Sequence, residues 1–429
     1  MSKYIDFSFL PCYIFLDYIL QRRIIMNPIR KIYCRAFQKA FHIAIPFLPY
    51  RKPKIAGSVK ELPEIIMRHK CTHVLIITDA GIARLGLTRR LEKTLNEAGI
   101  PYTIYDKTVA NPTTVNVKEA LNLYHENGCD AIIGFGGGSS MDCAKAVGAR
   151  AVKPKQTLAQ MKGILKIHKK LPLLIAIPTT AGTGSETTLA AVITDAETRH
   201  KYAINDFPLI PRYAVLDPKV TLSLPPFITA TTGMDALTHA VEAYIGNSTT
   251  PGTRKNALDA VRLIFENLDT AYTDGNNIEA RQNMLRASYF AGCAFTKSYV
   301  GYVHAIAHSL GGKYNVPHGL ANAVILPMVL ETYGDSITHK LRNLAVTAGL
   351  CDKHEDDKTA ARMFIDAIKD MKKRFGIGDY IPEIQETDIP ELAHYADKEA
   401  NPLYPVPVLM DASELETLYY RLMPPAGNC

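Results

Sequence analysis

The regular alternation of strand-like and helix-like segments in the first half of the chain, and its loss in the second half, most constrains the fold. Short runs typical of buried strands occur at residues 73–78, 102–105, 131–135 and 173–177. Helix-like stretches fall at residues 84–98, 115–127 and 141–151. Alternation of this kind predicts a Rossmann-like parallel sheet with helices on both faces.

The alternation stops near Pro225 and Pro226, and helical periodicity dominates from there on. Helices are expected at residues 229–244, 253–272, 279–297 and 302–310. A chain of 429 residues suits two domains rather than one. We therefore predict an N-terminal extension at residues 1–50, an α/β domain at 51–224 and an all-helical domain at 225–429. Ligands are expected in the cleft between the two domains.

Positive charge is concentrated at the N-terminus. The net charge is +7, but residues 1–60 alone hold eleven Lys or Arg against Asp6 and Asp17. The rest of the chain is therefore close to neutral. A body without a basic surface is not expected to bind nucleic acid.

The first part of this basic extension is also apolar. Residues 7–20 are rich in apolar and aromatic side chains, but Pro11 and Asp17 interrupt the run, which is too short to span a bilayer. No small-residue cleavage site follows it, so a secretory signal is poorly supported. Met26 is an alternative start of the chain.

Residues 29–48 alternate basic and apolar side chains, which predicts an amphipathic helix. We favour the interpretation that the apolar face of this helix packs on the protein's own body, because most amphipathic helices do so. The alternative is weak contact with an anionic membrane surface.

The eight cysteines are scattered singly, and none forms a CxxC pair. This pattern argues against a zinc knuckle and a disulfide framework. We expect a reducing, cytoplasmic compartment.

A glycine-rich turn lies between a predicted strand and a predicted helix. It consists of Gly136, Gly137, Gly138 and Ser139. Glycine lets the backbone approach a pyrophosphate closely, and the free amides at a helix N-terminus bind the anion. The usual GxGxxG pattern is absent, and tight strand-to-helix turns use glycine in any case. Dinucleotide binding in the α/β domain is the favoured interpretation.

Two further segments are candidates for cofactor contacts. Asp79 ends the first strand, where a carboxylate can bind the ribose hydroxyls and repel a 2′-phosphate. Its position before the glycine turn is not the usual order, and it is equally suited to cap a helix. The loop at residues 178–186 is rich in small hydroxyl and glycine residues, a composition that ordinary turns share.

The helical half carries a histidine and aspartate constellation. Asp235 and His239 are four residues apart, as are His304 and His308, so each pair shares one face of a helix. His318 follows in the segment Pro-His-Gly. A buried group of imidazoles and a carboxylate is costly unless a cation satisfies it. One carboxylate with histidines and no cysteine suits Fe²⁺ or Zn²⁺, which predicts a metal-binding domain at residues 225–429.

With these motifs, the chain resembles the iron-containing alcohol dehydrogenases over about residues 51 to 350. The signatures are the segment at residues 233–244 (GMDALTHAVEAY) and the segment at 301–312 (GYVHAIAHSLGG), followed by the Pro-His-Gly at 317–319. The resemblance implies a dehydroquinate synthase-like architecture. It implies that the metal ligands are Asp235, His239, His304 and His318. It also implies that His308 faces the substrate and the nicotinamide.

The resemblance further implies a set of cofactor contacts: Asp79, Gly136, Gly137, Gly138, Ser139, Thr179, Thr180, Thr183 and Lys201. The expected cofactors are Fe²⁺, with Zn²⁺ as an alternative, and NAD in preference to NADP. The expected reaction is hydride transfer between NAD(H) and a small primary alcohol, diol or aldehyde, by a homodimer or larger oligomer.

Two alternatives stay open from the sequence. One is a glycerol dehydrogenase- or dehydroquinate synthase-like enzyme of the same fold, and these lack the arrangement of His304, His308 and His318 seen here. The other is a non-catalytic protein that binds nucleotide and metal and docks through its basic N-terminus.

Overall fold

A six-stranded sheet forms the centre of the first half of the computed structural model, which describes residues 26–425. Its strand order is β1-β9-β6-β4-β2-β3, and every neighbouring pair is parallel. The strands are β1 (Lys54–Ala56), β2 (Val74–Asp79), β3 (Tyr102–Thr108), β4 (Ala131–Gly136), β6 (Leu173–Pro178) and β9 (Tyr213–Val215). A smaller sheet holds β5 (Gly163–Ile164), β7 (Ala190–Thr194) and β8 (Lys201–Asn205).

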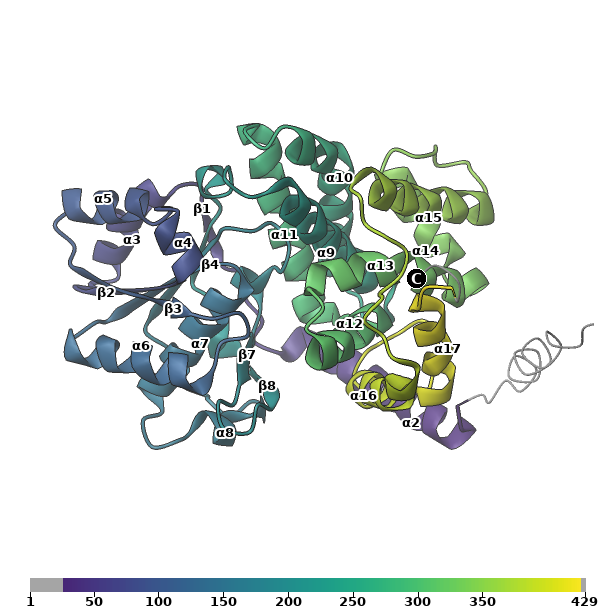
Figure 1. Ribbon diagram of the computed structural model, residues 1–429, viewed down its shortest axis with the longest axis horizontal. Coiled ribbons are helices and arrows are strands. Elements are labelled where there is room, and N and C mark those ends of the chain that lie inside the picture. The colour runs from purple at the N-terminus through teal and green to yellow at the C-terminus, as the bar shows by residue number, and fades with distance from the viewer. Residues whose placement is uncertain (1–25, 426–429) are drawn as a thin grey trace, which may run out of the picture.

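Helices cover both faces of the large sheet (Figure 1), as the alternating pattern predicts. They are α3 (Leu62–Arg68), α4 (Ala80–Arg84), α5 (Arg89–Glu97), α6 (Thr114–Glu126), α7 (Gly138–Val152) and α8 (Leu158–Met161). One apolar core joins the sheet to α3 and α5, and a separate core joins it to α6 and α7. The central strands β2 and β4 are therefore buried on both sides, which explains their continuous apolar runs.

The four predicted strands are confirmed, and the helix predicted at residues 84–98 is present as α5 but begins five residues later, at Arg89. The short helix α4 ends at Arg84, and the turn between α4 and α5 passes through Gly86 at φ +66°. Only glycine adopts this left-handed conformation readily, so the helix cannot continue through it. The short strands β1 and β9 and the antiparallel pair β7 and β8 were not predicted.

Among the residues described between 226 and 425, the second half contains helices and connecting turns but no strand. Its helices are α9 (Pro226–Ile245), α10 (Pro251–Thr273), α11 (Ile278–Ser298), α12 (Tyr302–Tyr314), α13 (His318–Tyr333), α14 (Thr338–Thr347), α15 (Asp357–Arg374), α16 (Ile389–Ala400) and α17 (Ala412–Leu422). They share one large apolar core. The four predicted helices correspond to α9 to α12, and the predicted domain boundary near residue 224 falls between β9 and α9.

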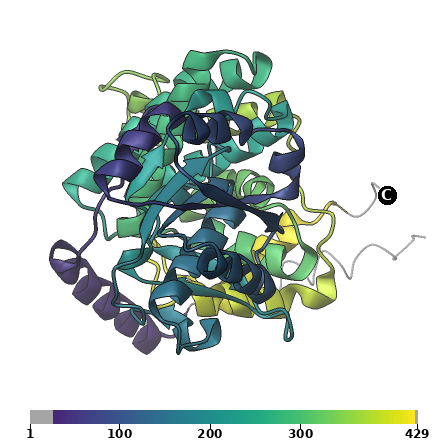
Figure 2. The ribbon, with the colours of Figure 1, turned by 90° about the vertical axis from the view of Figure 1, so that its left-hand side faces the viewer.

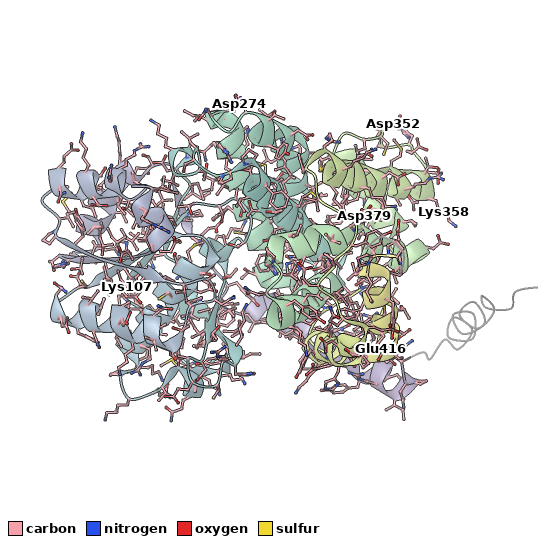
Figure 3. All side chains as sticks on the ribbon, viewed as in Figure 1. Lys107, Asp274, Asp352, Lys358, Asp379 and Glu416 are labelled. Atoms are coloured by element: carbon pink, nitrogen blue, oxygen red, sulfur yellow. The ribbon has the colours of Figure 1, made fainter. Side chains whose placement is uncertain are left out.

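Short 3-10 turns connect many of these elements: η1 (Ile45–Phe47), η2 (Val59–Glu61), η3 (Ser185–Thr187), η4 (Phe207–Leu209), η5 (Pro218–Val220), η6 (Gly334–Ser336) and η7 (Glu386–Asp388). The two halves lie side by side along the longest axis (Figure 1), and exposed charged side chains such as Lys107, Asp274 and Lys358 lie on their outer surfaces (Figure 3). Among residues 26–425, no helix has both the length and the apolar character needed to cross a membrane.

Helix α2 (Pro28–Ala44) forms as predicted, and the prediction that its apolar residues pack on the body holds for one side of the helix only. That side buries Cys34 and places the ring of Phe41 edge-on against Tyr299, and it also makes polar contacts, from Arg30 to Asp397 of α16 and from Gln38 to the carbonyl of Tyr404. The other side is apolar as well but faces solvent, with Ile32 70% exposed. In Figure 2, α2 lies at the margin of the molecule. The apolar run at residues 7–20 lies outside the described residues.

Candidate metal centre and nucleotide site

The carboxyl ends of β2, β4 and β6 lie next to one another in the sheet. Asp79 is the last residue of β2, Gly136 is the last residue of β4, and Thr179 follows β6. The chain pairs β3 on one side of β2 and β4 on the other, so a topological switch point lies between β2 and β4. Ligands of open α/β sheets bind outside the carboxyl ends of the strands at such a point. The structure thus brings Asp79 beside the glycine turn although their sequence order is unusual.

The glycine turn leads directly into α7, which begins at Gly138, three residues earlier than predicted. Gly137 precedes the helix, and no side chain caps its N-terminus. A Cβ on Gly136, whose φ is +152°, would lie 2.5 Å from Oγ of Ser140, so only glycine fits there. The first amides of α7 are therefore available to an anion.

The loop after β6 packs against this turn. The position of a Cβ on Gly137 lies 3.8 Å from Oγ1 of Thr180, and that of a Cβ on Gly138 lies 3.5 Å from Cγ2 of Thr183. Oγ1 of Thr180 is buried and makes no hydrogen bond to any described residue. A buried hydroxyl without a partner beside a glycine-rich helix N-terminus fits the phosphate groups of a dinucleotide.

Asp79 was predicted either to bind the ribose or to cap a helix, and the structure shows that it caps α4. Its Oδ1 accepts hydrogen bonds from the backbone amides of Gly81 (2.9 Å) and Ile82 (3.0 Å) at the start of α4. Both bonds use the same oxygen, so Oδ2 is left for a further donor. Capping and ribose binding are therefore compatible at this residue.

Four of the predicted site residues come together in the helical half. Asp235 and His239 lie on α9, His304 lies on α12, and His318 begins α13. One ligand atom of each lies within 4.8 Å of those of the other three. Asp235, His239 and His304 are buried, and His318 is partly exposed. The i, i+4 spacing of Asp235 and His239 and the packing of α13 against both α9 and α12 produce this convergence.

The electrostatics of this group fit a bound cation. Burial lowers the pKa of His239, that of His318 to about 4, and that of His304 well below its usual value. The three imidazoles are thus neutral, with lone pairs facing one another and the carboxylate of Asp235. Neutral imidazole nitrogens and one carboxylate oxygen are a ligand set for Fe²⁺ or Zn²⁺.

Two buried polar residues support the ligands, and the sequence analysis missed both. Glu242 accepts hydrogen bonds from Nδ1 of His304 (2.6 Å) and from the amide of Val303 (2.8 Å), which leaves Nε2 of His304 for a metal. Asn322 donates its amide to Oδ1 of Asp235 at 2.6 Å. Both lie close in sequence to a ligand, Glu242 three residues after His239, and that spacing was the available signal. Burial raises the pKa of Glu242 to about 7.

Glu242→Gln is expected to weaken metal binding about 10- to 100-fold, because the amide cannot accept all the hydrogen bonds that orient His304. A chelator competition titration with Fe²⁺ or Zn²⁺ measures the change. Glu266→Gln, at an exposed ion pair on α10, is the matched control and should leave the affinity unchanged. Equal affinities for both variants would show that Glu242 does not position the ligand.

His308 lies beside the group of four, but its Nδ1 points away from them, toward Glu399. It makes a 2.6 Å hydrogen bond with Oε1 of Glu399, which also accepts the hydroxyl of Tyr404 at 2.6 Å. The ring stacks on that of His318, with 5.2 Å between centroids, and the side chain is 43% exposed. Burial opposes the charged form of His308, but the charge and hydrogen bond of Glu399 outweigh it and raise the pKa.

Lys201 is connected to the glycine turn through Asn111. Its Nζ donates to Oδ1 of Asn111 (2.7 Å), and the backbone N–H of Asn111 donates to Oγ of Ser139 in the glycine turn (3.3 Å). Burial lowers the pKa of Lys201, and the charge of Glu399 opposes this effect. Lys201 is therefore linked to the glycine turn through Asn111.

Comparison with known proteins covers both halves of the chain. The model of the family described as iron-containing alcohol dehydrogenase matches residues 55–218, and that of its C-terminal part matches residues 229–423, beyond the residue 350 expected from the sequence. The 1,3-propanediol dehydrogenase of Klebsiella pneumoniae is 37% identical over 367 residues, which are 85% of this chain and 94% of that protein.

Solved structures agree with these matches. A 1,3-propanediol oxidoreductase superposes with a TM-score of 0.83 at 35% identity, over 87% of this chain and 98% of the other. The sulfoacetaldehyde reductase of Bifidobacterium kashiwanohense, solved with NAD⁺, gives a TM-score of 0.77 at 28% identity. The match covers 87% of this chain and 98% of the reductase. The predicted fold class and the predicted enzyme class, an oxidoreductase acting on alcohols or aldehydes, are confirmed. The chain belongs to the iron-containing alcohol dehydrogenase family.

Proposed function

We propose that this chain uses one Fe²⁺ ion and NAD(H) to interconvert a small primary alcohol or diol and its aldehyde. The observation that carries this proposal is the convergence of Asp235, His239, His304 and His318 in the helical half, where the loop after β6 packs on α9 through Gly182. Zn²⁺ is the alternative ion, since one carboxylate with three imidazoles accepts both. Relatives named for propanediol and sulfoacetaldehyde support a small substrate.

When bound, the metal supplies a Lewis acid for the substrate oxygen, and the nicotinamide carries the hydride. The chain positions both partners. The amides at the N-terminus of α7 bind the pyrophosphate, and Thr180 and Thr183 line the opposite side of the turn. Asp235 and the three histidines fix where the substrate oxygen lies. Phe295, stacked on His239 at 4.2 Å between centroids, holds that ring in place.

His308 is the residue that we assign to proton transfer. It is accessible to solvent, adjoins His318, and has Nδ1 held by Glu399, so Nε2 is available to the substrate hydroxyl. In alcohol oxidation the neutral imidazole accepts the hydroxyl proton, and in reduction the imidazolium returns it. His308→Ala should lower turnover while metal and NADH affinity persist.

Glu399→Gln is expected to shift the acidic limb of the pH profile for alcohol oxidation to lower pH. The charge of Glu399 raises the pKa of His308, so its removal lowers that pKa and keeps the imidazole neutral to a lower pH. The kcat/KM for alcohol is measured from pH 5 to 10. Glu383→Gln, an exposed acid of the same domain, is the control. An unchanged limb would contradict the role of Glu399.

Asp79→Asn is expected to raise the ratio of kcat/KM for NADPH over NADH by about tenfold. Asparagine caps a helix as well as aspartate does, so α4 should persist, while the charge that repels a 2′-phosphate is lost. Steady-state rates with both cofactors give the ratio. If the ratio does not change, Asp79 does not select the cofactor.

The proposed activity is tested by NADH oxidation across a panel of short aldehydes, with NADPH in parallel. Turnover that prefers NADH supports the proposal. Binding of metal and NADH without turnover of any aldehyde or alcohol would contradict it and favour a lyase-type or non-catalytic protein of this fold. Two further properties stay predictions: assembly as a homodimer or larger oligomer, and a reducing, cytoplasmic compartment. The six cysteines among the described residues are all free, which fits a reducing compartment.

A further inference from the structure

Helix α2 and the turn η1 after it present a continuous apolar stripe to solvent. Its exposed members are Ile29 (77%), Ile32 (70%), Tyr33 (58%), Phe37 (39%), Ile43 (61%) and Phe47 (85%). Spacings of three and four residues place those of α2 on one face, with Ala36 and Ala40 between them. A stripe of this length is far larger than the single exposed apolar residues found on most protein surfaces.

The opposite face of α2 packs on the helical half through Cys34 and Phe41, and polar contacts fix it there. The guanidinium of Arg30 makes two 2.7 Å bonds to the carboxylate of Asp397, which is only 8% exposed. Arg35 donates to the backbone carbonyls of Val406 and Pro407, each at 2.7 Å. Rotation of α2 to bury its apolar side would leave these groups without partners. The apolar stripe is therefore a permanent feature of the surface.

The charge around the stripe selects its partner. No Asp or Glu occurs between Tyr18 and Lys60, and residues 1–60 carry nine more positive than negative charges. On α2 itself, Lys39 is exposed and Lys31 partly so, and neither makes an ion pair with a described residue. A second copy of this chain would bring like charges together, whereas an anionic bilayer offers complementary charge and an apolar interior.

We propose that this stripe docks the protein on an anionic lipid bilayer, with α2 lying in the plane of the interface. The apolar side chains enter the headgroup region while Lys39, at the edge of the stripe, contacts lipid phosphates. Binding of this kind requires no membrane-spanning helix.

The test is co-sedimentation of the full chain with vesicles of phosphatidylcholine and phosphatidylglycerol in a 7:3 ratio. The variant Ile32→Ser/Phe37→Ser should partition at least about tenfold more weakly than the wild type, because it loses two large apolar side chains. The matched control is Met67→Ser/Ile164→Ser, which removes two equally exposed apolar residues outside the stripe and should bind as the wild type does. Wild-type binding should also fall with added salt and with pure phosphatidylcholine.

Two outcomes would overturn the proposal. If the stripe variant binds anionic vesicles as tightly as the control, α2 is not the docking surface. If the wild type does not bind vesicles but sediments as a dimer that Ile32→Ser/Phe37→Ser dissociates, the partner is a second copy. Both variants should retain aldehyde turnover in solution, since the substituted residues take no part in the metal or nucleotide site, and this retention shows that they fold.

Discussion

Replacing Asp235 by asparagine is expected to abolish tight metal binding and to lower kcat/KM for aldehyde reduction on the order of 10³-fold or more. Asp235 is the single anionic member of the group of four and is buried. The amide has nearly the same shape, and its oxygen can still accept the hydrogen bond from Asn322, so the helices should keep their positions. Metal content after anaerobic dialysis and NADH oxidation measure the two effects.

The control for this variant is Asp335→Asn, which removes an equally charged but 77% exposed carboxylate in the same half of the chain. It should keep its metal and its turnover. Full metal content and normal turnover in Asp235→Asn would mean that the group of four is not the metal site.

Gly138→Asp is expected to raise the KM for NADH on the order of 10²-fold, because it places a negative charge where the pyrophosphate binds. A Cβ at this position meets its nearest neighbour, Thr183, at an ordinary distance of 3.5 Å, so the substitution fits. A carboxylate in the first turn of α7 also interacts favourably with the helix dipole, so the Tm should not fall. Steady-state kinetics and thermal unfolding measure both.

The control variant Gly138→Ala distinguishes the effect of the added negative charge from the effect of the added side-chain volume. It adds the same Cβ without the carboxylate, and its KM for NADH should stay within a few-fold of the wild type. Normal NADH affinity in Gly138→Asp would show that the pyrophosphate does not bind at this turn.

The histidine and aspartate constellation could be predicted from sequence because its spacing depends on local geometry, whereas the choice of these four residues as metal ligands came from the family resemblance. Asp235 and His239 share a helix face at a spacing of four residues, and His304 and His318 stand among apolar and small residues that indicate burial. Glu399 could not be predicted, because it is 91 residues from His308 and reaches it only through the packing of α16 on α12. Contacts of this range leave no periodic signal in one sequence.

Two features could not be settled from sequence, each for a physical reason. Hydrophobic periodicity shows which residues of α2 share a face but not which way that face points. Here Asp397 and the backbone carbonyls that Arg35 contacts hold the polar face inward. The doubt about Asp79 arose from its position before the glycine turn, yet β2 and β4 are neighbours in the sheet, so chain order does not separate the two.

The most direct test of the account is a titration of metal-free protein with Fe²⁺ under anaerobic conditions, followed by NADH oxidation with a short aldehyde. The site of Asp235, His239, His304 and His318 predicts no turnover without metal and a linear rise that saturates at one ion per chain. Turnover by the metal-free protein at the same rate as by the loaded protein would contradict the metal-dependent mechanism.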